Sequence, residues 1–194
     1  MSLAGELEAV IEVKASADKV HEVFSCRPHI VTSISPQSVQ SCELIEGEWG
    51  KPGAVICWTF TRSSVIEFVV RKSDAGNPQI VKELIEVVDD ENYITIFKLI
   101  EGNVLEMLYK SFCSVAKVTQ KDDHEGGSLV RFTYKYEKQN ENVPDLESKV
   151  LEMMIDIVKN IDAYIIQHEE ARVDDTDEVL LVNVNSQEIE SPSQ

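Results

Sequence analysis

Histidine and cysteine side chains are the first candidates for metal or redox chemistry in this sequence. The chain contains four of each, His21, His29, His124, His168, Cys26, Cys42, Cys57 and Cys113. A metal site that can be read from sequence has two ligands at a short spacing, such as H-E-x-x-H or C-x-x-C, and neither pattern occurs. Widely spaced cysteines in a reducing compartment stay as free thiols. We therefore predict no metal and no cofactor, and interpret the cysteines as small residues of a core or sheet. A metal site assembled from distant residues is the alternative.

A glycine-rich segment is a candidate for phosphate binding. Gly47, Gly50 and Gly53 lie in one short stretch, and such loops can turn backbone N–H groups toward an anion. A P-loop, however, continues with Gly-Lys-Ser/Thr into a helix. Here residues 54–61 alternate like a strand. We interpret the segment as a rigid structural turn, with nucleotide binding as the alternative.

Lys110 and Tyr134 are the candidates for general acid–base catalysis. Such catalysis requires side chains that share one enclosed site and have a shifted pKa. Nothing in the sequence brings these two together. An enzyme is therefore an alternative hypothesis, and no catalytic residue is assigned.

The net charge argues against several classes of partner. Acidic residues outnumber basic ones 35 to 18, and the formal net charge is −17. Nucleic acids and anionic membrane surfaces are bound through clustered Lys and Arg, which this balance disfavours. No apolar run approaches the roughly 20 residues of a membrane span, and the first residues lack the features of a signal peptide. We expect a monomeric, cytoplasmic protein that neither binds nucleic acid nor inserts into a membrane.

Hydrophobic periodicity predicts the elements that must position these side chains. Apolar and polar residues alternate over residues 6–14, as in a half-buried strand. Ser16 can cap a helix that ends before Pro28, and a second short helix follows at 30–34. Further strands are predicted at 38–46, 54–61, 64–72, 79–88, 93–101, 104–120 and 128–139. Because the connections between them are short, neighbouring strands should run antiparallel.

The strongest helical pattern comes after these strands. It follows the turn Asn142-Val143-Pro144, and its apolar positions recur every three or four residues: Leu146, Val150, Met153, Met154, Ile157, Val158, Ile161, Tyr164 and Ile165. A helix with one apolar stripe must lie against a large apolar surface, and the sheet is the surface that the chain offers. We predict an α+β domain over residues 1–168.

The composition changes after His168. Residues 169–194 contain eight acidic residues and one basic residue, Arg172. Such an excess of charge favours a disordered tail. The apolar patch at 179–184 interrupts the acidic sequence and is a candidate site for a protein partner.

Several stretches of the chain resemble one plant protein family in order and spacing. They are Glu12-Val13-Lys14-Ala15-Ser16-Ala17-Asp18-Lys19, Glu46-Gly47-Glu48-Trp49-Gly50-Lys51-Pro52-Gly53, Asp89-Asp90-Glu91-Asn92, Leu99-Ile100-Glu101-Gly102, Leu108-Tyr109-Lys110-Ser111-Phe112, Gly127-Ser128-Leu129-Val130 and Tyr136-Glu137-Lys138. The sequence resembles the major latex protein branch of the birch pollen allergen (Bet v I) and pathogenesis-related class ten superfamily. The resemblance covers the chain from about Glu6 to His168.

The resemblance implies a helix-grip (START-like) fold, in which a seven-stranded curved antiparallel sheet surrounds a long C-terminal helix and two short helices support one end. It also implies a hydrophobic cavity between sheet and helix. The chain departs from the family in two places. Residues 63–72 look like an inserted extra strand, and the acidic tail is longer than the family norm.

Periodicity alone would assign the inward-facing positions to ordinary core packing, whereas the resemblance makes them candidates for a ligand cavity. The predicted wall comprises Phe24, Ile56, Trp58, Phe60, Thr95, Phe97, Leu99, Leu108, Phe112, Phe132, Tyr134, Met153, Met154, Ile157 and Val158.

The resemblance implies a function in binding, storage or transport. The expected ligands are small hydrophobic molecules of the plant hormone, sterol, fatty acid or flavonoid class, and the expected setting is a defence or stress response. Two alternatives stay open. One is an enzyme of secondary metabolism that catalyses a condensation or isomerisation in the cavity, and the other is a module for ligand-dependent protein interaction.

Overall fold

A computed structural model describes residues 3–61, 79–102, 108–122 and 126–186 of this chain, and only the backbone of 79, 170 and 172–186. The described elements are β1 (Ala4–Val13), α1 (Ala17–Ser25), the 3-10 helix η1 (Pro28–Ile30), α2 (Val31–Ile34), β2 (Val39–Glu46), β3 (Val55–Phe60), β4 (Gln79–Asp89), β5 (Ile94–Gly102), β6 (Tyr109–Gln120), β7 (Ser128–Lys138) and α4 (Glu147–Ser186). The extra strand predicted at 63–72 lies outside the described residues, and so does the start of the strand predicted from Val104.

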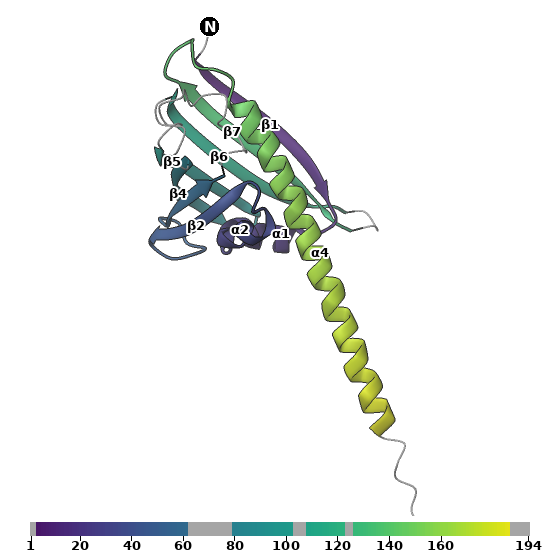
Figure 1. Ribbon diagram of the computed structural model, residues 1–194. Helices are drawn as coiled ribbons and strands as arrows, with labels where there is room; N and C mark the ends of the chain where they lie inside the picture. Colours follow the sequence, from purple (N-terminus) through teal and green to yellow (C-terminus); the bar gives the residue numbers. More distant parts are fainter. Residues whose placement is uncertain (1–2, 62–78, 103–107, 123–125, 187–194) are drawn as a thin grey trace, which may run out of the picture.

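The predicted antiparallel sheet is confirmed. Its seven strands lie in the order β1-β7-β6-β5-β4-β3-β2, and every pair of neighbours is antiparallel. Strands β2 to β7 follow one another as a meander, while β1 joins β7 at the far edge (Figure 1). The first and last strands of the chain therefore lie side by side.

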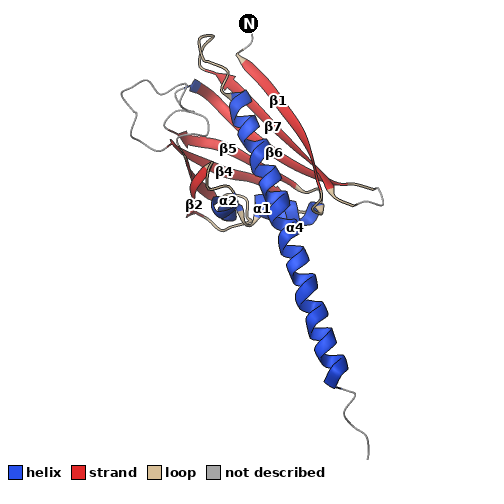
Figure 2. Ribbon diagram, turned by 45° about the vertical axis from the view of Figure 1, so that its right-hand side comes forward, coloured by secondary structure: helices blue, strands red, loops and turns tan. Residues whose placement is uncertain are grey.

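Helix α4 lies across one face of this sheet, with α1 and α2 at one end of the body (Figure 2). It packs against β1, β7, α1 and α2. The predicted apolar stripe is the face that is buried, because Leu146, Met153, Ile157, Val158 and Ile161 are all nearly inaccessible to solvent. The helix-grip architecture expected from the sequence is thus observed.

The backbone of α4 continues to Ser186, into the acidic segment for which the sequence favoured a disordered tail after His168. Figure 1 shows the helix running on past the end of the sheet. Acidic composition does not by itself end a helix, and no Gly or Pro occurs between Asp145 and Ser186 to do so. Extending a helix that is already formed is also far easier than starting one.

Several polar contacts fix α4 on the body, and one of them lies at the end of β1. One carboxylate oxygen of Asp162, Oδ1, accepts hydrogen bonds from the backbone N–H groups of Lys14 (2.9 Å) and Ala15 (2.8 Å). These two donors follow the last residue of β1, where the sheet no longer provides partners. Asp162 thereby ties the helix to the edge of the sheet.

Replacing Asp162 with Leu is expected to lower the free energy of unfolding by about 1–3 kcal/mol, because two backbone donors lose their acceptor. Replacing it with Asn should cost clearly less, since the amide keeps an oxygen in the same place. Urea denaturation of the two variants measures the difference. Equal stability of the Leu and Asn variants would contradict this role.

Another contact is a cluster at the start of α4. Glu147 is buried. Its carboxylate accepts a hydrogen bond from the Tyr109 hydroxyl (2.6 Å) and forms an ion pair with Lys138 Nζ (2.8 Å). Tyr109 belongs to β6 and Lys138 to β7. The cluster therefore joins the first turn of α4 to the adjacent ends of β6 and β7.

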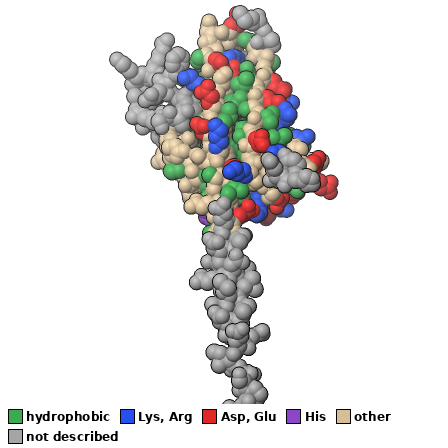
Figure 3. All heavy atoms as spheres, turned by 90° about the vertical axis from the view of Figure 1, so that its right-hand side faces the viewer, with side chains coloured by type: hydrophobic (Ala, Val, Ile, Leu, Met, Phe, Trp, Pro, Cys, Tyr) green, Lys and Arg blue, Asp and Glu red, His purple; other side chains and the backbone are tan. Residues whose placement is uncertain are grey.

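Ion pairs join β1 to β7 and to the residue that follows β6. Glu12 pairs with Lys121, and Glu8 pairs with Arg131. Figure 3, which views the body from the right-hand side of Figure 1, shows acidic and basic side chains interspersed on that side. Among the described residues, no helix combines the length and apolar composition that a membrane crossing needs.

Candidate functional site

A cavity lies between the sheet and α4, with α1, η1 and α2 at one end. The volume of this cavity is about 100 Å³. By this measure one water molecule needs only about 10–15 Å³, so the space is large enough for a small organic molecule. The cavity wall is formed by Val23, Phe24, Pro28, Val31, Val39, Trp58, Phe60, Val81, Glu83, Phe97, Phe112, Ser114, Phe132, Tyr134, Leu146, Val150, Met153, Met154 and Ile157.

Most of the side chains predicted for the cavity lie on its wall. They are Phe24, Trp58, Phe60, Phe97, Phe112, Phe132, Tyr134, Met153, Met154 and Ile157. Aromatic rings form a continuous cluster there, because Phe112 contacts Tyr134 (ring centroids 5.0 Å apart) and Phe132 contacts both Tyr134 (5.3 Å) and Phe24 (6.0 Å). The structure thus brings together aromatic side chains from three separate elements, α1, β6 and β7.

Five predicted wall positions are corrected by the structure. Ile56, Thr95 and Val158 are fully buried in the core, and Leu99 and Leu108 are partly buried against it, but none of the five borders the cavity. Alternation along a strand identifies the inward face. It does not say where along that face neighbouring side chains fill the interior.

The sequence reasoning missed nine wall residues, namely Val23, Pro28, Val31, Val39, Val81, Glu83, Ser114, Leu146 and Val150. Most come from the short helices and from element ends, where periodicity is weak. For Val81 and Glu83 the sequence did contain a signal. The two residues stand four and two positions before Ile85 on the same strand, so they share the inward face of Ile85, which is fully buried. Lys82 and Glu83 are adjacent charged residues, so the sequence does not show which of the two faces inward.

Among the described residues of the cavity wall, Glu83 is the one with a charged side chain. Its Oε2 accepts a hydrogen bond from Trp58 Nε1 at 3.0 Å. Burial raises the pKa of Glu83 to about 7, and the Trp58 hydrogen bond offsets only part of that effect. The apolar cavity therefore contains one carboxyl group that can change its charge near neutral pH.

The acid–base pair considered from the sequence does not form. Lys110 is exposed, and its Nζ pairs with Glu137 at 2.7 Å. Tyr134 is buried on the cavity wall, where burial and the nearby charge of Glu83 raise its pKa well above the ordinary value. The two candidate residues thus lie in different environments.

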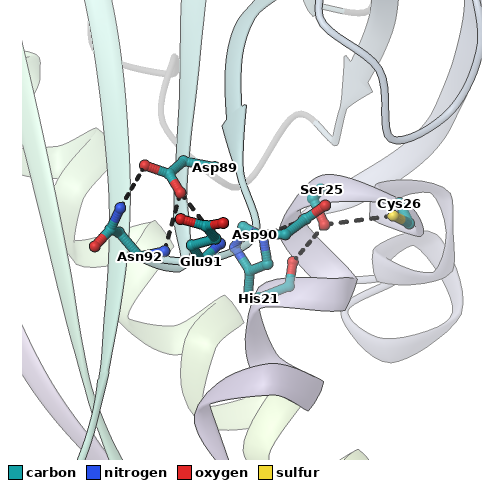
Figure 4. A network of polar contacts seen from close by, with 7 residues as sticks. All are labelled: His21, Ser25, Cys26, Asp89, Asp90, Glu91 and Asn92. Atoms are coloured by element: carbon teal, nitrogen blue, oxygen red, sulfur yellow. Dashed lines mark hydrogen bonds and ion pairs between the residues drawn. The ribbon is translucent and has the colours of Figure 1, made fainter.

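A second polar cluster joins α1 to the turn between β4 and β5 (Figure 4). His21 Nε2 contacts Asp90 Oδ1 at 2.9 Å, and Ser25 Oγ donates to the backbone carbonyl of His21 at 2.9 Å. Asp89 Oδ1 accepts the backbone N–H groups of the same turn, including that of Asn92 at 2.9 Å. Because the Ser25 hydroxyl bonds to a backbone carbonyl and not to the imidazole, the cluster is no Ser-His-Asp triad. We interpret it as a structural brace.

The glycine-rich segment between β2 and β3 is a tight turn bonded to β4. Gly47, Gly50 and Gly53 all have positive φ, and the Gly53 N–H donates to the carbonyl of Ile85 at 2.8 Å. A Cβ atom at position 50 would come within 2.6 Å of Cys26 Sγ, so only glycine fits there without movement. The segment leads into a strand, and the helix N-terminus of a P-loop is absent at this place. Among the described residues, no group of three or more His, Cys, Asp or Glu side chains could hold a metal ion.

Comparisons with known proteins agree with this architecture. The model of the Pathogenesis-related protein Bet v 1 family matches residues 2–168. MLP-like protein 31 of Arabidopsis thaliana is 37% identical over 168 residues, covering 87% of this chain and 90% of that protein. MLP-like protein 28 of the same plant is 36% identical over 169 residues, and here the chain spans only about half of the relative (46%).

Solved structures show the same likeness. The crystal structure of major latex-like protein 151 from Panax ginseng superimposes with a TM-score of 0.72 at 33% identity, covering 84% of this chain and 98% of that one. Norcoclaurine synthase from Thalictrum flavum, in complex with dopamine and hydroxybenzaldehyde, has a TM-score of 0.64 at 20% identity and covers 85% of this chain and 88% of the enzyme. The second likeness concerns the fold alone.

Proposed function

The chain belongs to the pathogenesis-related Bet v 1 family, in its major latex protein branch, and from this premise we propose that it binds and carries small hydrophobic molecules without transforming them. The ligand would occupy the cavity between the sheet and α4. The candidate ligand classes are plant hormones, sterols, fatty acids and flavonoids, and the process served would be a defence or stress response in the cytoplasm.

The observation that carries this proposal is the character of the cavity wall. All but three of its described side chains, Glu83, Ser114 and Tyr134, are hydrophobic. Burial of apolar surface is worth about 25 cal/mol per Å², so enclosing some 300 Å² of a ligand gives about 7 kcal/mol before the costs of association. Affinities near the micromolar range follow from that value.

The helix side of the wall is suited to several ligands rather than one. Met153 and Met154 of α4 both line the cavity, and Met154 is only half-buried. Flexible thioether side chains can repack around molecules of different shape. We therefore expect broad specificity within the apolar classes.

The wall offers little for catalysis. Its described titratable groups are Glu83 and Tyr134, and the Tyr134 hydroxyl, with its raised pKa, does not ionise near neutral pH. Norcoclaurine synthase acts on the same fold, but its 20% identity carries no residue role to this chain. Binding without turnover is the function that the wall supports best.

Displacement of an uncharged apolar fluorescent dye tests the proposal. The dye should bind the folded protein with a dissociation constant near the micromolar range, and sterols or flavonoids should displace it. The folded state is checked by circular dichroism under the same conditions. Folded protein that neither enhances dye fluorescence nor binds any candidate ligand in calorimetry would refute a carrier function.

A further inference from the structure

The cavity has one polar region, and it is centred on Glu83. The residues of β4 alternate between the two faces of the sheet, so that Val81, Glu83 and Ile85 point inward while Glu86 is exposed. Glu83 thus occupies a position where the pattern calls for an apolar side chain. Placing a carboxyl group there has a cost in stability, which suggests that the group has a use.

Three other polar groups lie on the wall of the same cavity. Trp58 Nε1 donates to Glu83 Oε2, which fixes one carboxyl oxygen. Ser114 and Tyr134 are direct partners on the neighbouring strands β6 and β7, and both lie on the cavity wall with Glu83. The wall therefore combines a large apolar surface with a few convergent polar groups, as specific small-molecule sites do.

We propose that Glu83 selects the ligand by its polar group, accepting a hydrogen bond from a hydroxyl or amine and rejecting a carboxylate. This inference rests on the proposed binding function. It narrows the ligand class to apolar molecules that carry a hydrogen-bond donor, and it argues against fatty acids and other carboxylate ligands.

The physical reason is the low polarity of the cavity. Two carboxylates that approach each other among hydrophobic side chains repel strongly, because little water is present to screen them. A hydroxyl or ammonium group instead gives the Glu83 carboxylate a donor in place of the water lost on binding. A site built to accept a donor therefore discriminates well against a ligand that lacks one.

The discrimination should depend on pH through Glu83 alone. Cys42 of β2 and Tyr134 of β7 interact with the same carboxyl group, and burial followed by the charge of Glu83 raises the pKa of each well above neutrality. Cys113 of β6 also senses Glu83, and burial followed by the charges of Glu86 and Glu83 raises the pKa of its thiol. All three groups therefore stay neutral between about pH 5 and pH 8. The described wall residues of α1, α2, β5, β6 and α4 carry no titratable group, and Lys82 lies on the other face of β4, paired with Glu101. Because the pKa of Glu83 is raised to about 7, the carboxylate repels anions above that pH and is progressively neutralised below it.

Three ligands with one apolar skeleton test the proposal, namely naphthylethanol, naphthylethylamine and naphthylacetate. Calorimetric titration at about pH 8 should show the wild-type protein binding the alcohol and the amine at least about tenfold more tightly than the acetate. The variant Glu83→Gln should bind the acetate more tightly and reduce the difference between alcohol and acetate to less than about threefold. Glu86→Gln, an equal change on the exposed face of the same strand, should behave like the wild type.

Lowering the pH gives an independent readout. Between about pH 8 and pH 6 the acetate should gain affinity for the wild-type protein and not for Glu83→Gln, because naphthylacetate itself stays ionised in this range. A head-group preference that persists in Glu83→Gln would overturn the role of Glu83 and leave the carrier function standing. Failure of all three ligands and of the uncharged dye to bind the folded wild type would overturn both.

Discussion

Replacing Met154 with Trp is expected to lower the affinity for an uncharged apolar ligand by at least about tenfold, the equivalent of 1.4 kcal/mol. Met154 lies on the cavity wall and is only half-buried, so the larger indole can enter the space without first displacing the core. The cavity has a volume of only about 100 Å³. A bulky ring would occupy much of it, and any ligand would lose contact area in proportion.

The matched control is Ala163→Trp, which adds the same ring to the exposed side of α4. Positions nine residues apart lie on opposite sides of an α-helix, so this variant should bind the dye as the wild type does. Dye titration measures the affinities, and thermal unfolding shows whether each variant is folded. A folded Met154→Trp protein with unchanged affinity would mean that the dye binds elsewhere.

Replacing Glu147 with Gln is expected to have the largest effect on stability, a loss of about 2–4 kcal/mol at neutral pH. The amide can accept at one atom only, so its N–H₂ group would face either the Tyr109 hydroxyl or the Lys138 ammonium, and one of these two donors would lose its acceptor. Lys138 would then lose its counter-ion in a largely enclosed setting, since only 19% of its side chain is exposed. Because the cluster joins α4 to β6 and β7, we also expect the start of the helix to fray.

The pH dependence of this loss follows from the pKa of Glu147. Burial alone would raise that pKa, but the hydrogen bonds from Lys138, Tyr109, the Glu147 backbone N–H and Tyr136 together outweigh burial and lower it. A lowered pKa contributes stability above the pKa of the unfolded state, about 4.3, and the contribution disappears as the pH falls through the folded-state pKa. The wild type and Glu147→Gln should therefore differ most near neutral pH and converge in acid.

Denaturant unfolding of both proteins from neutral to acidic pH measures the effect. Glu152→Gln changes an exposed residue of the same helix and should alter the unfolding free energy by less than about 0.5 kcal/mol. If Glu147→Gln were as stable as the control at neutral pH, the cluster would not hold the helix.

Glu83 and Glu147 are two residues whose surroundings the sequence does not predict. Both are acidic residues next to a basic or polar neighbour, and composition would place both in solvent. One lies on the wall of an apolar cavity beside Trp58, and the other is buried under Tyr109 and Lys138. Their surroundings come from strands distant in the chain, which no local pattern specifies.

The order of the elements, the antiparallel pairing, the family and the inward faces of most strands can be predicted from the sequence. The elements and their faces follow from alternation in strands and from the three- and four-residue spacing in the helix, and both depend on local backbone geometry. Packing decides which inward side chains border the cavity and which partners Asp162 and Glu147 find. Asp162 bonds to a residue 148 positions earlier in the chain. Such contacts, like the volume left empty inside the molecule, depend on how side chains from separate elements fill one space, and that is settled only when the elements pack.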